Sequence, residues 1–261
     1  MTRRDLSETL LPIFTLALAL LAWEGLVRYY AIPPYILPVP SLVIATLIKD
    51  WGTLSGSLIV TLSVTFEALA AAVVGGVAIA VVFAQWRLVE RAFFPFAVAM
   101  QVTPIVAIAP LLLIYLSAKA AVLAVAFLVA FFPILANTTL GLSSADRNLV
   151  DLFRLYRASR WRQLVWLRLP SSLPYFLAGL RIGGGLALIG AIVAEIAAGS
   201  AGGGAGLAYR IVESGFRLNI SRMFAALLLI SASGIAIYLM LSALSYVLLR
   251  HWHESAQERE A

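Results

Sequence analysis

The sequence predicts an all-α membrane protein with six transmembrane helices and one long loop on the cytoplasmic side. The chain has 261 residues, of which 62% are hydrophobic and 12% charged, whereas an average soluble domain is about half apolar and about a quarter charged. Apolar stretches of roughly 20 residues, enough to cross about 30 Å of hydrocarbon, recur along the chain. Helices satisfy their own backbone groups in lipid, so these stretches are expected to be helical spans.

The expected spans lie within a single domain over residues 1–261. They cover residues 10–30, 58–85, 93–116, 120–142, 173–198 and 223–249. The first apolar run is long, contains Glu24 and Arg28, and lacks a small-residue cleavage site. It therefore reads as a retained helix and not as a cleaved signal.

The basic residues indicate the orientation. If both termini are cytoplasmic, most of the 19 Lys and Arg residues lie on the inner side, including six arginines between Arg147 and Arg168. The positive-inside rule favours this arrangement. The net charge of +6 then reflects topology, and nucleic acid is not an expected partner.

Two connections are expected on the outer side. Four prolines exclude a helix over residues 31–40, after which Ser41 can cap a short interfacial helix that runs through Trp51. The later connection contains Gly202, Gly203, Gly204 and Gly206, which are typical of a flexible turn.

The cytoplasmic loop, residues 143–172, is predicted to hold two short helices. In the first, Leu149, Leu152, Phe153 and Tyr156 share one face, and Arg147, Asp151, Arg154 and Ala158 the other. Ser159 can cap a second helix, and Pro170 and Pro174 are expected to stop it before the fifth span. Amphipathicity alone leaves two interpretations open: a partner protein covers the loop, or it lies on anionic lipid with Trp161 and Trp166 as anchors.

The spacing within this loop resembles the signature of binding-protein-dependent ABC importer permeases: E-A-A, three residues, G, nine residues, I, one residue, L-P. The corresponding positions here are Asp151, Leu152, Phe153, Arg157, Leu167, Leu169 and Pro170. The segments 158–161, 169–175 and 178–181 are similar to those of the nitrate, sulfonate and taurine branch. Leu152 and Phe153 replace alanines, and Arg157 replaces the glycine that permits a tight break. Because arginine tolerates positive φ poorly, we expect the break to move to Ala158–Ser159 or the loop to stay helical.

This resemblance implies a permease subunit of an ATP-driven importer in the bacterial inner membrane. It further implies a separate ATP-binding subunit, an extracytoplasmic solute-binding protein and a second permease copy as partners. The loop would couple ATP hydrolysis to transport through Asp151, Leu152, Phe153, Arg154, Tyr156, Arg157, Ala158, Ser159, Leu169 and Pro170. Phe153 and Tyr156 are the expected buried anchors, with Asp151 and Arg154 forming pairs at the rim.

Several chemistries are excluded from the chain itself. Neither lysine, Lys49 or Lys119, is followed by Ser or Thr after a glycine-rich turn, so no phosphate-binding loop is present. There is no cysteine, and the two histidines, His251 and His253, form a tail pair without a third metal ligand. We therefore expect no catalytic residue, no bound metal and no cofactor.

Polar residues inside the spans are candidates for the translocation path, because each is costly in lipid unless it faces protein or water. Gln101 and Thr103, beside Pro104, and Glu195 are the preferred candidates; Glu24, Glu67 and Asn137 are weaker. Small residues at Gly179, Gly183, Ala187 and Ala191 favour helix packing. An ion-coupled secondary transporter is the alternative function, and the solute stays open among sulfonate, nitrate and pyrimidine-like or riboflavin-like compounds.

Overall fold

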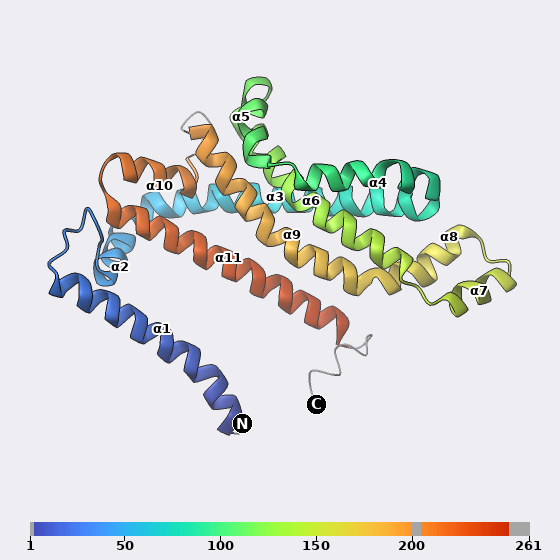
Figure 1. The fold of residues 1–261 in the computed structure, drawn as a ribbon, viewed down its shortest axis with the longest axis horizontal. Coiled ribbons are helices and arrows are strands. Elements are labelled where there is room, and N and C mark those ends of the chain that lie inside the picture. The colour runs from blue at the N-terminus through green and yellow to red at the C-terminus, as the bar shows by residue number, and fades with distance from the viewer. Residues whose placement is uncertain (1–2, 200–204, 251–261) are drawn as a thin grey trace.

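The computed structural model describes residues 3–199 and 205–250, and it is an elongated bundle of helices (Figure 1). His251, His253 and three glycines of the expected outer turn, Gly202 to Gly204, lie outside the described residues. The longer helices run along the long axis, with α7 and α8 at one end and α2 and α10 at the other. We refer to these as the α7 end and the α10 end.

The helices have the following bounds: α1 (Arg3–Tyr29), α2 (Pro40–Lys49), α3 (Trp51–Gln85), α4 (Arg87–Val102), α5 (Ile105–Tyr115), α6 (Ala118–Ser143), α7 (Arg147–Leu155), α8 (Arg160–Gln163), the π-helical turn η1 (Leu164–Arg168), α9 (Leu169–Ala198), α10 (Leu207–Phe216) and α11 (Ile220–Leu249). Five helical segments of the described chain are long and apolar enough to cross a bilayer, and the bent pair α4–α5 supplies a sixth crossing if it counts as one span. The all-α polytopic class is confirmed.

The centre of the bundle is α6, which packs most extensively on α9 and next on α3. The contact with α9 is close because α9 has glycines where the two backbones meet. A side chain at Gly190 would lie 2.9 Å from the Cα of Ala126, and one at Gly179 would lie 2.8 Å from the Cβ of Asn137. The small-residue stripe of the fifth span therefore serves helix packing within the chain, as expected.

The third predicted span, residues 93–116, consists of two helices with a break at Pro104. Helix α4 ends at Val102, α5 begins at Ile105, and their axes differ by 105°. Thr103, the residue before Pro104, has extended backbone angles (φ −68°, ψ 130°). Proline disfavours the helical conformation of the preceding residue and provides no N–H, so the helix cannot continue through this point.

The helix of the fifth span is longer than predicted. Pro170 and Pro174 do not stop the helix that precedes them. From Arg160 to Ala198 the chain is helical over 39 residues, because the turn at residues 164–168 widens into a π-helix. The Leu169 N–H bonds the carbonyl of Leu164, five residues back. This wider turn changes which carbonyls are used where Pro170 offers no N–H, and so it accommodates the proline.

Helix α2 begins differently from the expectation that Ser41 is its cap. Pro40 occupies the first helical position, and Val39 precedes the helix without a side-chain cap. The cap comes from α1: the Ser41 N–H and hydroxyl donate to the carboxylate of Glu24 at 3.0 and 2.7 Å. Glu24 also pairs with Arg28, as expected. A carboxylate at a helix N-terminus satisfies free N–H groups and complements the helix dipole.

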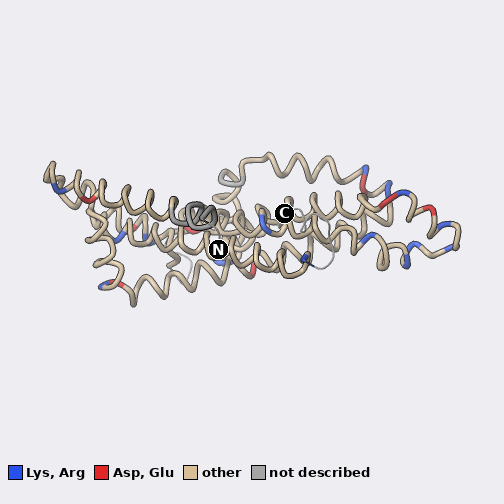
Figure 2. Tube along the Cα trace, turned by 90° about the horizontal axis from the view of Figure 1, so that it is seen from below, with Lys and Arg blue, Asp and Glu red and all other residues tan. Residues whose placement is uncertain are grey.

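Charged side chains gather towards the two ends of the molecule, and the long middle is mostly uncharged (Figure 2). This distribution is that of a protein whose middle lies in hydrocarbon and whose ends lie in water.

The close approach of α6 and α9 leads to a test with a matched control. Gly190→Ala places a methyl group against the α6 backbone, so unfolding should become easier by about 1–3 kcal/mol. Gly185→Ala lies on the same helix, where a Cβ meets nothing within 4 Å, and should be neutral or slightly stabilising. Thermal unfolding of both variants in detergent measures the difference, and equal effects would contradict the packing described.

Candidate functional site

Helix α7 is a short rod with an exposed apolar face. Asp146 caps its N-terminus, where the Asp146 carboxylate accepts the Asn148 N–H at 2.7 Å. Leu149 and Leu152 are each 45% exposed, and Tyr156 beyond the helix is 80% exposed. Within the described chain α7 makes at most marginal contact with other helices. The structure therefore brings the predicted apolar residues to one face, on which Leu149, Leu152 and Tyr156 are exposed and Phe153 is half-buried.

The break after α7 stays at Arg157, contrary to both expectations for this position. Arg157 has a positive φ of 50°. Two backbone bonds hold it there: the Arg157 N–H donates to the Arg154 carbonyl at 2.9 Å, and the Ala158 N–H to the Phe153 carbonyl at 2.9 Å. This is the Schellman arrangement that glycine usually completes. The hydrogen bonds outweigh the steric penalty of a side chain in the left-handed region.

The segment after the break returns to the bundle. Ser159 caps α8 as expected, accepting the Arg162 N–H at 3.3 Å. Leu164 is 1% exposed and packs in a core cluster with Phe83 of α3 and Leu142 of α6, where Leu169 joins it. Pro170 follows at the start of α9 and is exposed. The rod is thus joined to the bundle through α6 on one side and the α8–α9 helix on the other.

The polar face of α7 carries an ion pair within the helix itself. The Arg154 guanidinium lies 3.1 Å from the Asp151 carboxylate, and both side chains are about two-thirds exposed (68% and 66%). An exposed pair of this kind adds little stability.

The second polar region lies at the α10 end and is built around Glu195. Its carboxylate is buried, with 6% of the residue exposed. It accepts the Thr61 hydroxyl at 2.8 Å and the Ala208 N–H at 3.1 Å, and the same hydroxyl accepts the Leu207 N–H at 2.9 Å. Glu195 of α9 and Thr61 of α3 together satisfy the first N–H groups of α10, so three helices meet at one hydrogen-bonded point.

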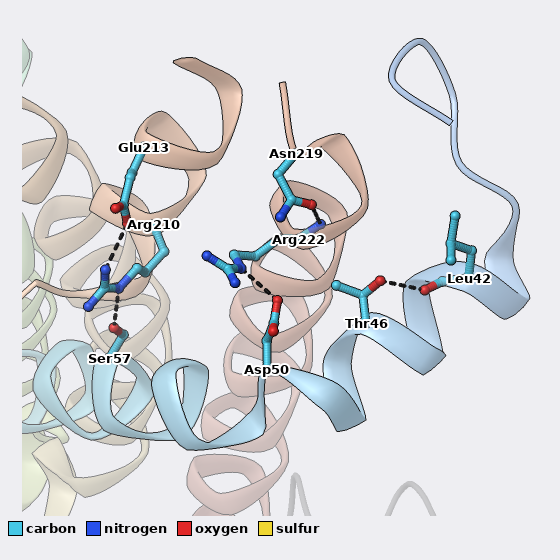
Figure 3. Close-up of polar contacts among 8 residues, drawn as sticks. All are labelled: Leu42, Thr46, Asp50, Ser57, Arg210, Glu213, Asn219 and Arg222. Atoms are coloured by element: carbon cyan, nitrogen blue, oxygen red, sulfur yellow. Dashed lines mark hydrogen bonds and ion pairs between the residues drawn. The ribbon is translucent and has the colours of Figure 1, made fainter. Parts of the chain in front are cut away.

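A second network of hydrogen bonds and ion pairs connects the helices at the α10 end (Figure 3). The Arg210 guanidinium donates to Ser57 at 3.0 Å and to Glu213 at 2.7 Å, which joins α10 to α3. Arg222 of α11 donates to Asp50 at 2.6 Å, where α2 meets α3. The hydrogen bond from Arg210 lowers the pKa of the Glu213 carboxyl below its ordinary value, and the charges of Arg210 and Arg217 act in the same direction.

The path residues predicted from the sequence share no hydrogen bond in the described chain. Gln101 and Thr103 are both exposed near the α4–α5 break, and the Thr103 hydroxyl donates to the Ala99 carbonyl at 2.9 Å. Sequence reasoning missed Thr61, which carries no signal of its own because its partner is 134 positions away. It also gave little weight to Glu67, an exposed carboxylate near the middle of α3.

Comparison with known proteins identifies this arrangement. The family described as "binding-protein-dependent transport system inner membrane component" matches residues 72–255. The chain belongs to this family. It is the permease component of an ABC-type import system, a transport subunit of the membrane, and the resemblance in the α7 loop is confirmed.

Relatives and solved structures agree with this assignment. The permease is 32% identical over 258 residues to the riboflavin transport system permease protein RibX of Chloroflexus aurantiacus, covering 94% of this chain and 90% of that protein. It is 32% identical to the formylaminopyrimidine transport permease protein ThiX of Halalkalibacterium halodurans, covering 93% and 96%. It is 27% identical to the taurine transport system permease protein TauC of Escherichia coli, covering 96% and 92%.

A solved structure has the same fold. The crystal structure of an amino acid ABC transporter with histidines superposes with a TM-score of 0.63 at 18% identity, and the match covers 79% of this permease and 97% of that chain.

The three-helix junction at Glu195 leads to a matched pair of variants. Thr61→Val leaves the buried carboxylate and the Leu207 N–H each short of one partner, so the permease should lose about 2–3 kcal/mol of stability. Thr65→Val makes the same change one turn along α3, where the buried hydroxyl bonds only the Thr61 carbonyl of its own helix. That control should cost about 1 kcal/mol or less. Thermal unfolding in detergent compares the two, and equal losses would contradict the junction.

The Glu213 network predicts an acid-dependent loss of stability. Because the folded-state pKa is lowered, the ionised carboxylate stabilises the fold above its unfolded pKa of about 4.3, and this contribution is lost as the pH falls through the folded value. Glu213→Gln should therefore be less stable than the wild type near neutral pH, and the difference should shrink in acid. Unfolding measured across the pH range tests this, and a difference independent of pH would refute it.

Proposed function

We propose that this permease moves a small solute inward, that a binding protein delivers the solute, and that a separate ATP-binding subunit docks on α7. The observation that carries the proposal is the uncovered apolar face of a rod anchored at both ends. Exposed apolar patches of this kind are typical of protein interfaces. A rigid rod transmits a displacement between subunits, whereas a flexible loop would absorb it.

The residues of the proposed coupling surface divide into three roles. Leu152, Phe153 and Tyr156 bury their side chains in a groove of the ATP-binding subunit. Arg157, Ala158 and Ser159 form the break that sets the angle between α7 and α8. Leu169 and Pro170 connect the α8 segment to α9. Asp151 and Arg154 lie on the opposite face of the rod.

The orientation belongs to the same proposal. The α7 end faces the cytoplasm, where the ATP-binding subunit acts, and both termini lie on that side. The arginines of the α7 and α8 segments support this placement by the positive-inside rule. The α10 end then receives the solute-binding protein, and Phe216 and Leu218, which are 87% and 69% exposed there, supply apolar contacts.

The position of Glu67 supports the proposal that two copies of the permease assemble. Glu67 lies near the middle of α3, on an exposed face that it shares with Ser63 one turn away. A carboxylate facing lipid at this depth would cost several kcal/mol. A path between two copies provides water for Glu67, because each copy alone would contribute one wall only.

The same carboxylate favours an uncharged solute. A negative charge on the path wall opposes the passage of nitrate or a sulfonate, and it accepts hydrogen bonds from the N–H groups of a heterocycle. RibX and ThiX, whose names give riboflavin and formylaminopyrimidine, are each more similar to this permease than TauC is. We therefore place a pyrimidine-like or riboflavin-like compound first among the solutes.

The proposal is tested on the reconstituted transporter with its ATP-binding and solute-binding subunits. Replacing Phe153 and Tyr156 with Ser removes the two aromatic anchors, which should weaken docking of the ATP-binding subunit at least about 30-fold, the scale of a hot-spot loss. Co-purification and solute-stimulated ATP turnover are the measurements. Riboflavin, a formylaminopyrimidine, taurine and nitrate are the solutes to compare.

The control keeps the apolar surface: Phe153→Leu with Tyr156→Phe should assemble and turn over ATP almost as the wild type does. Intact assembly and uptake in the double serine variant would reject the docking role of α7. Failure of every solute to raise ATP turnover would reject the importer as proposed.

A further inference from the structure

A cavity of about 810 Å³ opens at the α7 end, beside the polar face of α7. Its wall is formed by the end of α3, the start of α4, the end of α6, α7 and the π-turn η1. Residues that are far apart in the sequence, from Ala84 to Arg168, meet in this wall. The size lies within the range of small-ligand sites, which is roughly 300–1,000 Å³.

The cavity has a strong positive charge. Five arginines line it, namely Arg87, Arg91, Arg147, Arg154 and Arg168, against two carboxylates, Glu90 and Asp151. Of these five arginines, only Arg154 lies within ion-pairing distance of a carboxylate of the described residues. Four guanidinium groups around one cavity therefore have no anionic partner in the described chain. Like charges held together repel one another unless an anion lies between them.

The cavity does not coincide with the apolar face of α7. Arg147, Asp151 and Arg154 lie on the side of the rod that lines the cavity, whereas Leu149, Leu152 and Tyr156 lie about half a turn away on the other side. An ATP-binding subunit docked on the apolar face therefore leaves the arginine-lined wall available.

We propose that this cavity binds a phosphate-bearing anion. Guanidinium groups hold phosphate oxygens through paired, charge-assisted hydrogen bonds. The anion neutralises the excess charge and fixes α4 to α7. Its location on the cytoplasmic side rests on the function proposed above. There the phosphate belongs either to the head group of an anionic lipid or to a free phosphate compound.

The binding test uses the purified full-length permease in a neutral detergent, so it does not depend on transport. Dihexanoyl phosphatidylglycerol, dihexanoyl phosphatidylcholine and inorganic phosphate are titrated separately, and binding is followed by calorimetry and by thermal stabilisation. We expect phosphatidylglycerol to bind and phosphatidylcholine, which has the same chains but no net charge, not to bind. Binding by inorganic phosphate as well would assign the source to a free anion, and binding by the lipid alone would assign it to the membrane.

Variants distinguish anion binding in the cavity from a general attraction of anions to a basic surface. Arg87→Gln combined with Arg168→Gln should weaken binding by at least about tenfold, the scale of one charge-assisted contact. Arg162→Gln, an exposed arginine of α8 that does not line the cavity, should change it less than about twofold.

Three results would overturn the proposal. Equal binding of the two lipids would remove the requirement for an anion, and equal weakening by Arg162→Gln would reduce binding to net charge. Loss of binding in the assembled complex with the ATP-binding subunit would show that the cavity belongs to the protein interface. The importer function would stand in each case, because it is measured separately by solute-stimulated ATP turnover.

Discussion

The contact between α6 and α9 is the constraint on which the rest of the permease depends. Lipid offers no hydrophobic driving force between helices, so van der Waals packing at close range must hold them together. Gly179 and Gly190 permit that range, because a side chain at either position would overlap α6. These two helices also flank the α7 loop at one end, and α9 carries Glu195 at the other. Both functional regions are therefore attached to the same tightly packed pair.

The α10 end shows how a short helix is held where its backbone groups have little access to water. Two helices there start without a side-chain cap of their own, and in each case a carboxylate from another helix accepts the second N–H. Glu24 of α1 does this for α2 and Glu195 of α9 does it for α10. A carboxylate in these positions is costly alone but stabilising when it meets a helix N-terminus. The polar residues of these spans thus have a structural role at the membrane boundary.

The sequence predicted the class, the positions of the spans and the amphipathic character of α7, because each depends on local hydrophobic periodicity. The sequence-based predictions were wrong at positions where two local conformational preferences oppose each other. Pro104 lies at the break in its span, whereas Pro170 follows a π-turn within a continuous helix, and residue type does not distinguish the two positions. Arg157 takes the conformation of a glycine because two backbone hydrogen bonds hold it. The junction of Thr61 with Glu195 joins positions 134 residues apart, and the arginine-lined cavity draws on α3, α4, α6, α7 and η1, so neither follows from periodicity.

The continuous helix from Arg160 to Ala198 has a mechanical consequence. At 1.5 Å per residue its 39 residues extend at most about 58 Å. Ser159 precedes one end of this segment, and Glu195 lies near the other. The part between them is held against α6 at Gly179 and Gly190, so a rotation about that contact would move the two ends in opposite directions. The α7 loop and the junction at Glu195 are therefore connected by one continuous helical segment.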